Sequence, residues 1–152
     1  MIKNILYIFL ISMVPVVELR GAIPIGVGLG LPFYVVFIAA LIGNMVPVPL
    51  LILFTRPVFA WLRKKNRFCR AIVEKLEKRA ASKEDLLKRY ELLGLCILVA
   101  IPLPGTGGWT GAMVASFFDI RMRTAVPVIG LGILIAGIIV SVITYGVKIF
   151  II

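Results

Sequence analysis

The sequence has no histidine and only two cysteines, Cys69 and Cys96. A zinc site needs a cluster of Cys and His ligands, so the chain is expected to hold no metal. Its apolar segments also have no paired carboxylates and no Ser or Cys beside a base, so we expect neither an enzyme nor a cofactor. The two thiols are expected to stay unpaired, because disulfides are rare in a reducing compartment.

Charge is scarce as well. Only 16% of the 152 residues are charged, 61% are apolar, and the mean hydropathy is +1.10. A soluble domain of this size cannot bury so much apolar surface, so the bilayer has to act as its solvent. The sequence therefore predicts one all-α integral membrane domain over residues 1–152, in the plasma membrane of a bacterium or archaeon and in contact with membrane lipids.

The basic residues are concentrated in the middle of the chain. Twelve of the 17 lie between Arg56 and Arg89. The positive-inside rule makes segment 56–91 cytoplasmic, and a basic segment in so apolar a chain favours a membrane surface over nucleic acid. This segment is predicted to be an amphipathic helical linker on the inner membrane surface, because apolar residues recur in it at helical spacing, among them Trp61, Phe68 and Ile72.

The apolar runs of the first half have the wrong lengths for simple spans. A span needs about 20 helical residues, and run 21–55 is too long for one span but too short for two spans and a turn. Gly28, Gly30 and Pro32 mark a break within it. The elements predicted for the first repeat, residues 1–55, are a re-entrant helical hairpin over 3–31, turning near Glu18–Gly21, and a span over 33–54.

The second half follows the same plan. Run 92–118 is broken at its centre by the dense Pro and Gly residues of segment 102–108, which leaves two arms of about ten residues, each half a bilayer long. The elements predicted for the second repeat, residues 92–152, are a re-entrant hairpin over 92–118 and a span over 124–147.

A shift of 87 positions relates the two halves, since it places Pro15 on Pro102 and Gly21 on Gly108. With segment 56–91 in the cytoplasm, the two halves have opposite orientation and both termini lie outside. Interrupted segments at matching points of an inverted repeat indicate the midplane binding site of a transporter.

Two charges, Glu18 and Arg20, interrupt the first apolar hairpin. Charged groups at membrane depth are costly, and they usually face a protein interior or a water-filled substrate path. A carboxyl there can exchange a proton for a cationic substrate, which makes Glu18 the candidate coupling group. The alternative is an ion pair between Glu18 and Arg20 that only fixes the hairpin.

The turn of the second hairpin, segment 102–108, is called the second tip below. It contains no charged residue but has backbone N–H groups that could bind a ligand. Gly105, Gly107 and Gly108 expose N–H groups before a half-helix that is expected to begin near Trp109, and a helix N-terminus attracts anions. With Arg20 opposite, the tip could hold a phosphate or carboxylate, although the glycines could equally form only a tight turn. The other candidate residues for substrate or ion coupling are Gly21, Pro24, Asn44, Pro102, Pro104, Thr106 and Thr110.

Two motifs connect this chain to a known family. The order Val14-Pro-Val-Val-Glu-Leu-Arg-Gly-Ala-Ile-Pro24, a basic linker, and then Ile101-Pro-Leu-Pro-Gly-Thr-Gly-Gly-Trp-Thr-Gly-Ala112 resembles the small multidrug export protein family over essentially the whole chain. It is more distantly similar to the DedA/SNARE-associated membrane family, a resemblance that implies re-entrant hairpins and lipid-phosphate translocation. The wider family has arginine around its second motif, whereas segment 101–113 has no charge and Arg20 is the sole deep cation.

Three functions remain open from the sequence. The first is proton-coupled export of small hydrophobic or cationic compounds through a midplane site. The second is translocation of an anionic lipid such as a polyprenyl phosphate, bound by Arg20 and the Gly105–Gly108 amides. The third is a membrane scaffold acting through segment 56–91. Because two spans and two half-span hairpins enclose little, we also expect a homodimer.

Overall fold

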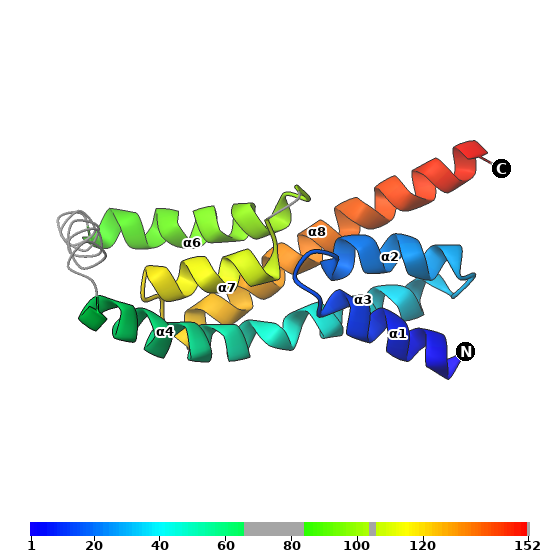
Figure 1. Ribbon diagram of the computed structural model, residues 1–152. Coiled ribbons are helices and arrows are strands. Elements are labelled where there is room, and N and C mark those ends of the chain that lie inside the picture. The colour runs from blue at the N-terminus through cyan, green and yellow to red at the C-terminus, as the bar shows by residue number, and fades with distance from the viewer. Residues whose placement is uncertain (66–83, 104–105, 152) are drawn as a thin grey trace.

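The computed structural model describes residues 1–65, 84–103 and 106–151 (Figure 1). Within these ranges the chain forms seven helices and no strand, so the predicted all-α fold is confirmed. The helices are α1 (Ile2–Ser12), α2 (Glu18–Gly28), α3 (Phe33–Met45), α4 (Pro47–Lys65), α6 (Glu84–Ala100), α7 (Gly108–Phe117) and α8 (Met122–Ile151).

Helices α1 and α2 form an antiparallel pair joined by residues 13–17 (Figure 1). The turn lies earlier than the expected position at Glu18–Gly21, because Pro15 lacks an N–H and disfavours a helical residue before it. Gly21 is tolerated inside α2, which begins at Glu18. The break expected near Gly30 is confirmed: Gly30 has a φ of 71°, and Pro32 precedes α3.

Two helical stretches are long and apolar enough to cross a membrane: Phe33–Thr55 and Met122–Val147. They coincide with the spans predicted over 33–54 and 124–147. The first is interrupted at Val46, between α3 and α4, where Pro47 and the following Pro49 cannot donate to the helix. Helix α4 then continues to Lys65, so the change from apolar to basic sequence at Arg56 does not end it.

The second half contains another antiparallel pair, α6 and α7, followed by α8. Helix α6 begins at Glu84 and is therefore longer than the ten-residue arm that we predicted, whereas α7 matches that length. Residues 66–83, the central half of the predicted amphipathic linker 56–91, lie outside the described residues.

The two pairs meet tip to tip in the middle of the molecule (Figure 1). The α1–α2 pair lies beside α3, the α6–α7 pair lies beside α4 and α8, and the chain direction of each element in the first half is opposite to that of its counterpart in the second.

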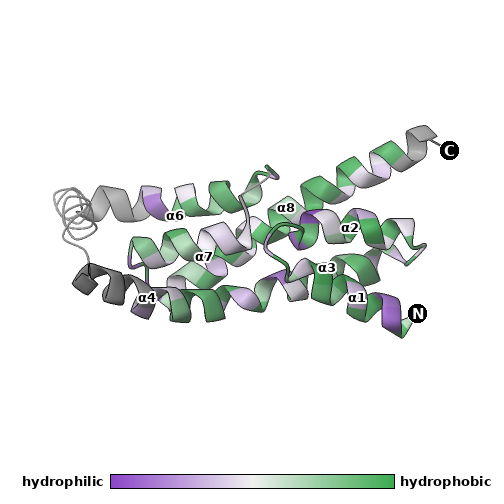
Figure 2. Ribbon diagram, viewed as in Figure 1, coloured by the Kyte–Doolittle hydropathy of each residue, from purple (hydrophilic) through white to green (hydrophobic). Residues whose placement is uncertain are grey.

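The core is built of small and branched apolar residues where these helices pack, with Ile23, Val36, Ile129 and Ile133 almost fully buried. Most of the helical ribbon is hydrophobic (Figure 2), and many large apolar side chains are exposed as well. Ile38 of α3 and Val142 of α8 are 53% and 67% exposed. A helix that is apolar on both its inner and outer faces is typical of a membrane protein.

Candidate functional site

The carboxylate of Glu18 lies at the N-terminus of α7. Its Oε1 atom accepts a hydrogen bond from the backbone N–H of Trp109 at 3.2 Å, and the backbone of Gly108 also interacts with it. Glu18 is only 4% exposed. An acidic side chain stabilises a helix N-terminus because it accepts from unpaired N–H groups and faces the positive end of the helix dipole. The anion at the second tip is therefore the chain's own Glu18.

The fit between Glu18 and the second tip depends on Gly107. This residue has a φ of 149°, which L side chains rarely adopt, and a β-carbon there would contact the Glu18 carboxylate. Glu18 itself has a φ of 47° at the start of α2. Non-glycine residues with positive φ are uncommon and are often found at functional positions.

Arg20 binds the other helix of the second pair. Its guanidinium donates to the backbone carbonyls of Leu103, Ile101 (3.1 Å) and Val99 (3.4 Å), which lie at and just beyond the C-terminus of α6. A cation is favourable there because the last carbonyls of a helix are unpaired and carry partial negative charge. Glu18 and Arg20 thus bind helix ends of opposite polarity.

The side chain of Trp109 adds a further bond between the tips, and that of Thr106 bonds within the second tip. The indole Nε1–H of Trp109 donates to the carbonyl of Met13 at 3.0 Å, so the second tip also binds the C-terminus of α1. The hydroxyl of Thr106 lies 2.7 Å from the carbonyl of Ile101 and 2.9 Å from that of Leu103, two of the carbonyls that Arg20 contacts. The tips are therefore joined by reciprocal bonds between side chains and backbone.

Asn44 is buried beside these contacts with only 1% of its surface exposed. Its Oδ1 atom lies 3.4 Å from the position of a β-carbon built on Gly108, the first residue of α7. Neither Oδ1 nor Nδ2 has a hydrogen-bond partner in the described structure. The Nε atom of Arg20 is likewise buried without a partner.

Four other candidate residues, Gly21, Pro24, Pro102 and Thr110, belong to the described structure. Gly21 lies half-buried in the first turn of α2, and Pro24 is exposed in the same helix. Pro102 lies half-buried in the second tip, and Thr110 lies half-buried in the first turn of α7. Pro104 and Gly105 lie outside the described residues.

Several acceptors of the site are contributed by ordinary apolar residues and were not predicted from the sequence. The carbonyls of Met13, Val99, Ile101 and Leu103 take part through their backbone, so their side chains gave no signal. One signal was available: a helix that ends at a Pro-rich turn leaves unpaired carbonyls, and a deep arginine is a suitable donor for them.

Comparison with known families decides where the chain belongs. Residues 18–139, which include Glu18 and the whole second tip, match the family described as putative small multi-drug export protein. The chain belongs to this export family. No curated protein and no solved structure shows significant similarity to this chain. The family and the two long apolar helices together indicate a membrane protein.

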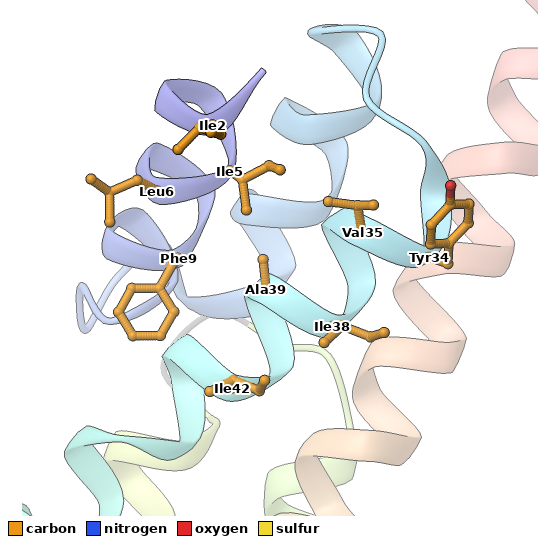
Figure 3. A pocket seen from close by; sticks show the side chains of 9 residues that line it. All are labelled: Ile2, Ile5, Leu6, Phe9, Tyr34, Val35, Ile38, Ala39 and Ile42. Carbon is orange, nitrogen blue, oxygen red and sulfur yellow. The ribbon is translucent and has the colours of Figure 1, made fainter.

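This member of the export family also has an apolar groove away from the tips. The groove runs between α1 and α3 and has a volume of about 560 Å³ (Figure 3). It is lined by Ile2, Ile5, Leu6, Phe9, Tyr34, Val35, Ile38, Ala39 and Ile42. Its lining is compatible only with an apolar molecule such as a hydrophobic solute or an acyl chain.

A second pocket, of about 360 Å³, lies where α6 approaches the turn between α7 and α8. Its charged lining residues are Glu91, Asp119 and Arg121.

Proposed function

We propose that the chain is a small secondary transporter, not an enzyme, which exports hydrophobic or cationic compounds in exchange for protons. The substrate path passes the junction of the two helix pairs, and Glu18 is the proton-binding group. In this proposal α1–α2 and α6–α7 are re-entrant hairpins of an inverted repeat, and their tips meet near the membrane midplane. Segment 56–91 is cytoplasmic, both termini are outside, and a second copy covers the exposed flanks of the hairpins.

The observation that carries this proposal is the hydrogen bond from the Trp109 N–H to Glu18. One carboxylate both stabilises the contact between the tips and can bind a proton. Protonation removes the negative charge that the N-terminus of α7 stabilises, so it weakens the contact between the tips. Proton binding is thereby linked to separation of the tips, as a proton-coupled carrier requires.

The alternative of an anionic-lipid translocase is less well supported by these contacts. A phosphate at the second tip would have to displace Glu18 from the Trp109 N–H and would meet an Arg20 guanidinium already bonded to carbonyls. The scaffold alternative acts through segment 56–91, half of which (66–83) lies outside the described residues.

The test uses purified protein in liposomes that contain a pH-sensitive dye. Ethidium or methyl viologen is added outside, and an exchanger carries the cation inward while protons leave the lumen. Glu18→Gln should reduce this proton flux at least tenfold, because Gln keeps an acceptor for the Trp109 N–H but cannot release a proton at any pH used.

Glu91→Gln is the matched control, since it removes a half-buried carboxylate that lies outside the tips. Its flux should equal that of the wild type. Proton flux in Glu18→Gln equal to that of the wild type would refute Glu18 as the coupling group. A wild-type protein that moves no protons with either cation would refute the proposed exchange.

A further inference from the structure

Asn44 is an unusual residue for a tightly packed interior. Its amide is 1% exposed, and both of its polar atoms lack a partner in the described structure. A buried polar group without a partner destabilises the fold, and such groups are rare enough that each one needs an explanation. Gly43, the residue before it, packs so closely on α1 that a β-carbon there would contact Ser12 and Phe9. The backbone beside Asn44 is therefore held against α1.

The surroundings of Asn44 indicate what it can bind. Its Oδ1 atom lies 3.4 Å from the position of a β-carbon on Gly108, the residue before the Trp109 N–H that Glu18 occupies. The N-terminus of α7 thus has two acceptors: a carboxylate from α2 that is bonded to it and an amide oxygen from α3 that is not. Asn is among the best residues for accepting hydrogen bonds from the first turn of a helix.

We propose that Asn44 is a positioning residue that accepts from the first turn of α7 when Glu18 is protonated. This inference rests on the proposed coupling at Glu18. When Glu18 is protonated, the Asn44 Oδ1 atom then replaces the Glu18 carboxylate, so the N-terminus of α7 keeps one acceptor. In this proposal the Asn44 amide is unpaired in the state shown by the present structure and bonded in the other state, which explains a polar residue in this interior.

Few other charged or titratable groups of the described structure lie near Glu18. Arg20, on the same helix, is the charged side chain that acts on Glu18. The described titratable groups of the helices packed around α2 are Lys3 and Tyr7 of α1, Tyr34 of α3, and Arg123 and Tyr145 of α8. Tyr7 is 51% exposed, and Arg123 lies in the first turn of α8, at the opposite end of that helix from Tyr145. Lys3 and Tyr34 each lie about ten residues, or roughly 15 Å, along their helices from the tip contacts, and Tyr145 lies against Phe33 at the far end of α3. A pH response at the tips is therefore assigned to Glu18.

Trp109 provides the reporter. The chain has two tryptophans, so Trp61→Phe leaves Trp109 alone. Because its indole bonds to Met13 and its backbone to Glu18, the exchange should change its emission. In this background, fluorescence is titrated against pH in phosphatidylcholine–phosphatidylglycerol nanodiscs. We expect one transition in the protein with Glu18 and Asn44 intact, and none in Glu18→Gln.

Asn44→Leu and Asn44→Ala should lower the midpoint of this transition. Without Asn44 the protonated form loses an acceptor, so more acid is needed to populate it. One such acceptor changes an equilibrium by roughly two- to thirty-fold, which corresponds to a fall of about 0.4 to 1.5 pH units. Leu has the branched shape of Asn and a larger volume, whereas Ala is smaller. A fall of the midpoint in both variants would therefore come from loss of the acceptor and not from a change in packing.

Ser141→Ala is the matched control. It removes a buried hydroxyl that bonds within its own helix, to Gly137, and should leave the midpoint unchanged. An unchanged or higher midpoint in a folded Asn44 variant, with the transition still abolished by Glu18→Gln, overturns the role of Asn44 alone. A transition that survives Glu18→Gln overturns the coupling itself and this inference with it.

Discussion

Substitution of Gly107 by Ala tests the contact between the tips without removing a charge. The added β-carbon would lie 2.6 Å from Cδ and 2.8 Å from Oε1 of Glu18, so the carboxylate has to move away from α7. The backbone also resists, because Gly107 has a φ of 149°. Strain of this kind costs about 1–3 kcal/mol and loss of an N-terminal acceptor about 0.5–2 kcal/mol, so we expect a loss of about 3 kcal/mol in unfolding free energy.

The measurement is unfolding by SDS in mixed micelles, followed by circular dichroism. Gly146→Ala in α8 is the matched control, since a β-carbon there meets nothing within 4 Å. Ala is the better helix former, so the control should be stabilised by up to about 1 kcal/mol. Hydrogen exchange should also show faster exchange of the first turn of α7 in Gly107→Ala alone. Equal stability of the two variants would refute the idea that Glu18 holds the second tip.

Two further changes test the other bonds of the junction. Arg20→Lys keeps the charge but loses the planar group that spans several carbonyls, so it should cost about 1–2 kcal/mol in the same unfolding assay; a wild-type value would show that only the charge matters. Trp109→Phe keeps an aromatic ring but removes the donor to Met13, and should cost about 1 kcal/mol. Undiminished stability of Trp109→Phe would contradict a structural role for that bond.

The fold was more predictable than the details of its turns. Apolar length and Pro/Gly breaks gave the helix order and both long apolar helices, because these features depend on local sequence. The turn between α1 and α2 lies earlier than the predicted position at Glu18–Gly21, because Pro15 decides where α1 ends. The sequence also does not show that the helix beginning at Glu84 continues without a break into the hairpin arm, because a charge marks where lipid contact ends and not where a helix ends.

The charged residues of the site could be predicted from the sequence, but the groups that they bind could not. Deep charges are rare enough to identify Glu18 and Arg20 from sequence alone. Their ligands are backbone groups on a segment 79 to 91 residues away, and any residue type can supply a backbone group. The sequence therefore suggested a bound phosphate or carboxylate opposite Arg20, and tertiary packing brings the chain's own carboxylate to that N-terminus.

The spacing of Glu18 and Arg20 explains why one short motif can bind both ends of the second turn. Residues two positions apart on a helix do not face each other, so the two charges diverge from the first turn of α2. One reaches the N-terminus of α7 and the other the C-terminal carbonyls of α6, each with the sign that the helix dipole favours. A spacing of three or four would direct both side chains to the same face and favour an ion pair. Because the charges bind separate helix ends, the protonation of Glu18 that we propose would release α7 from α2 while Arg20 keeps α6 attached.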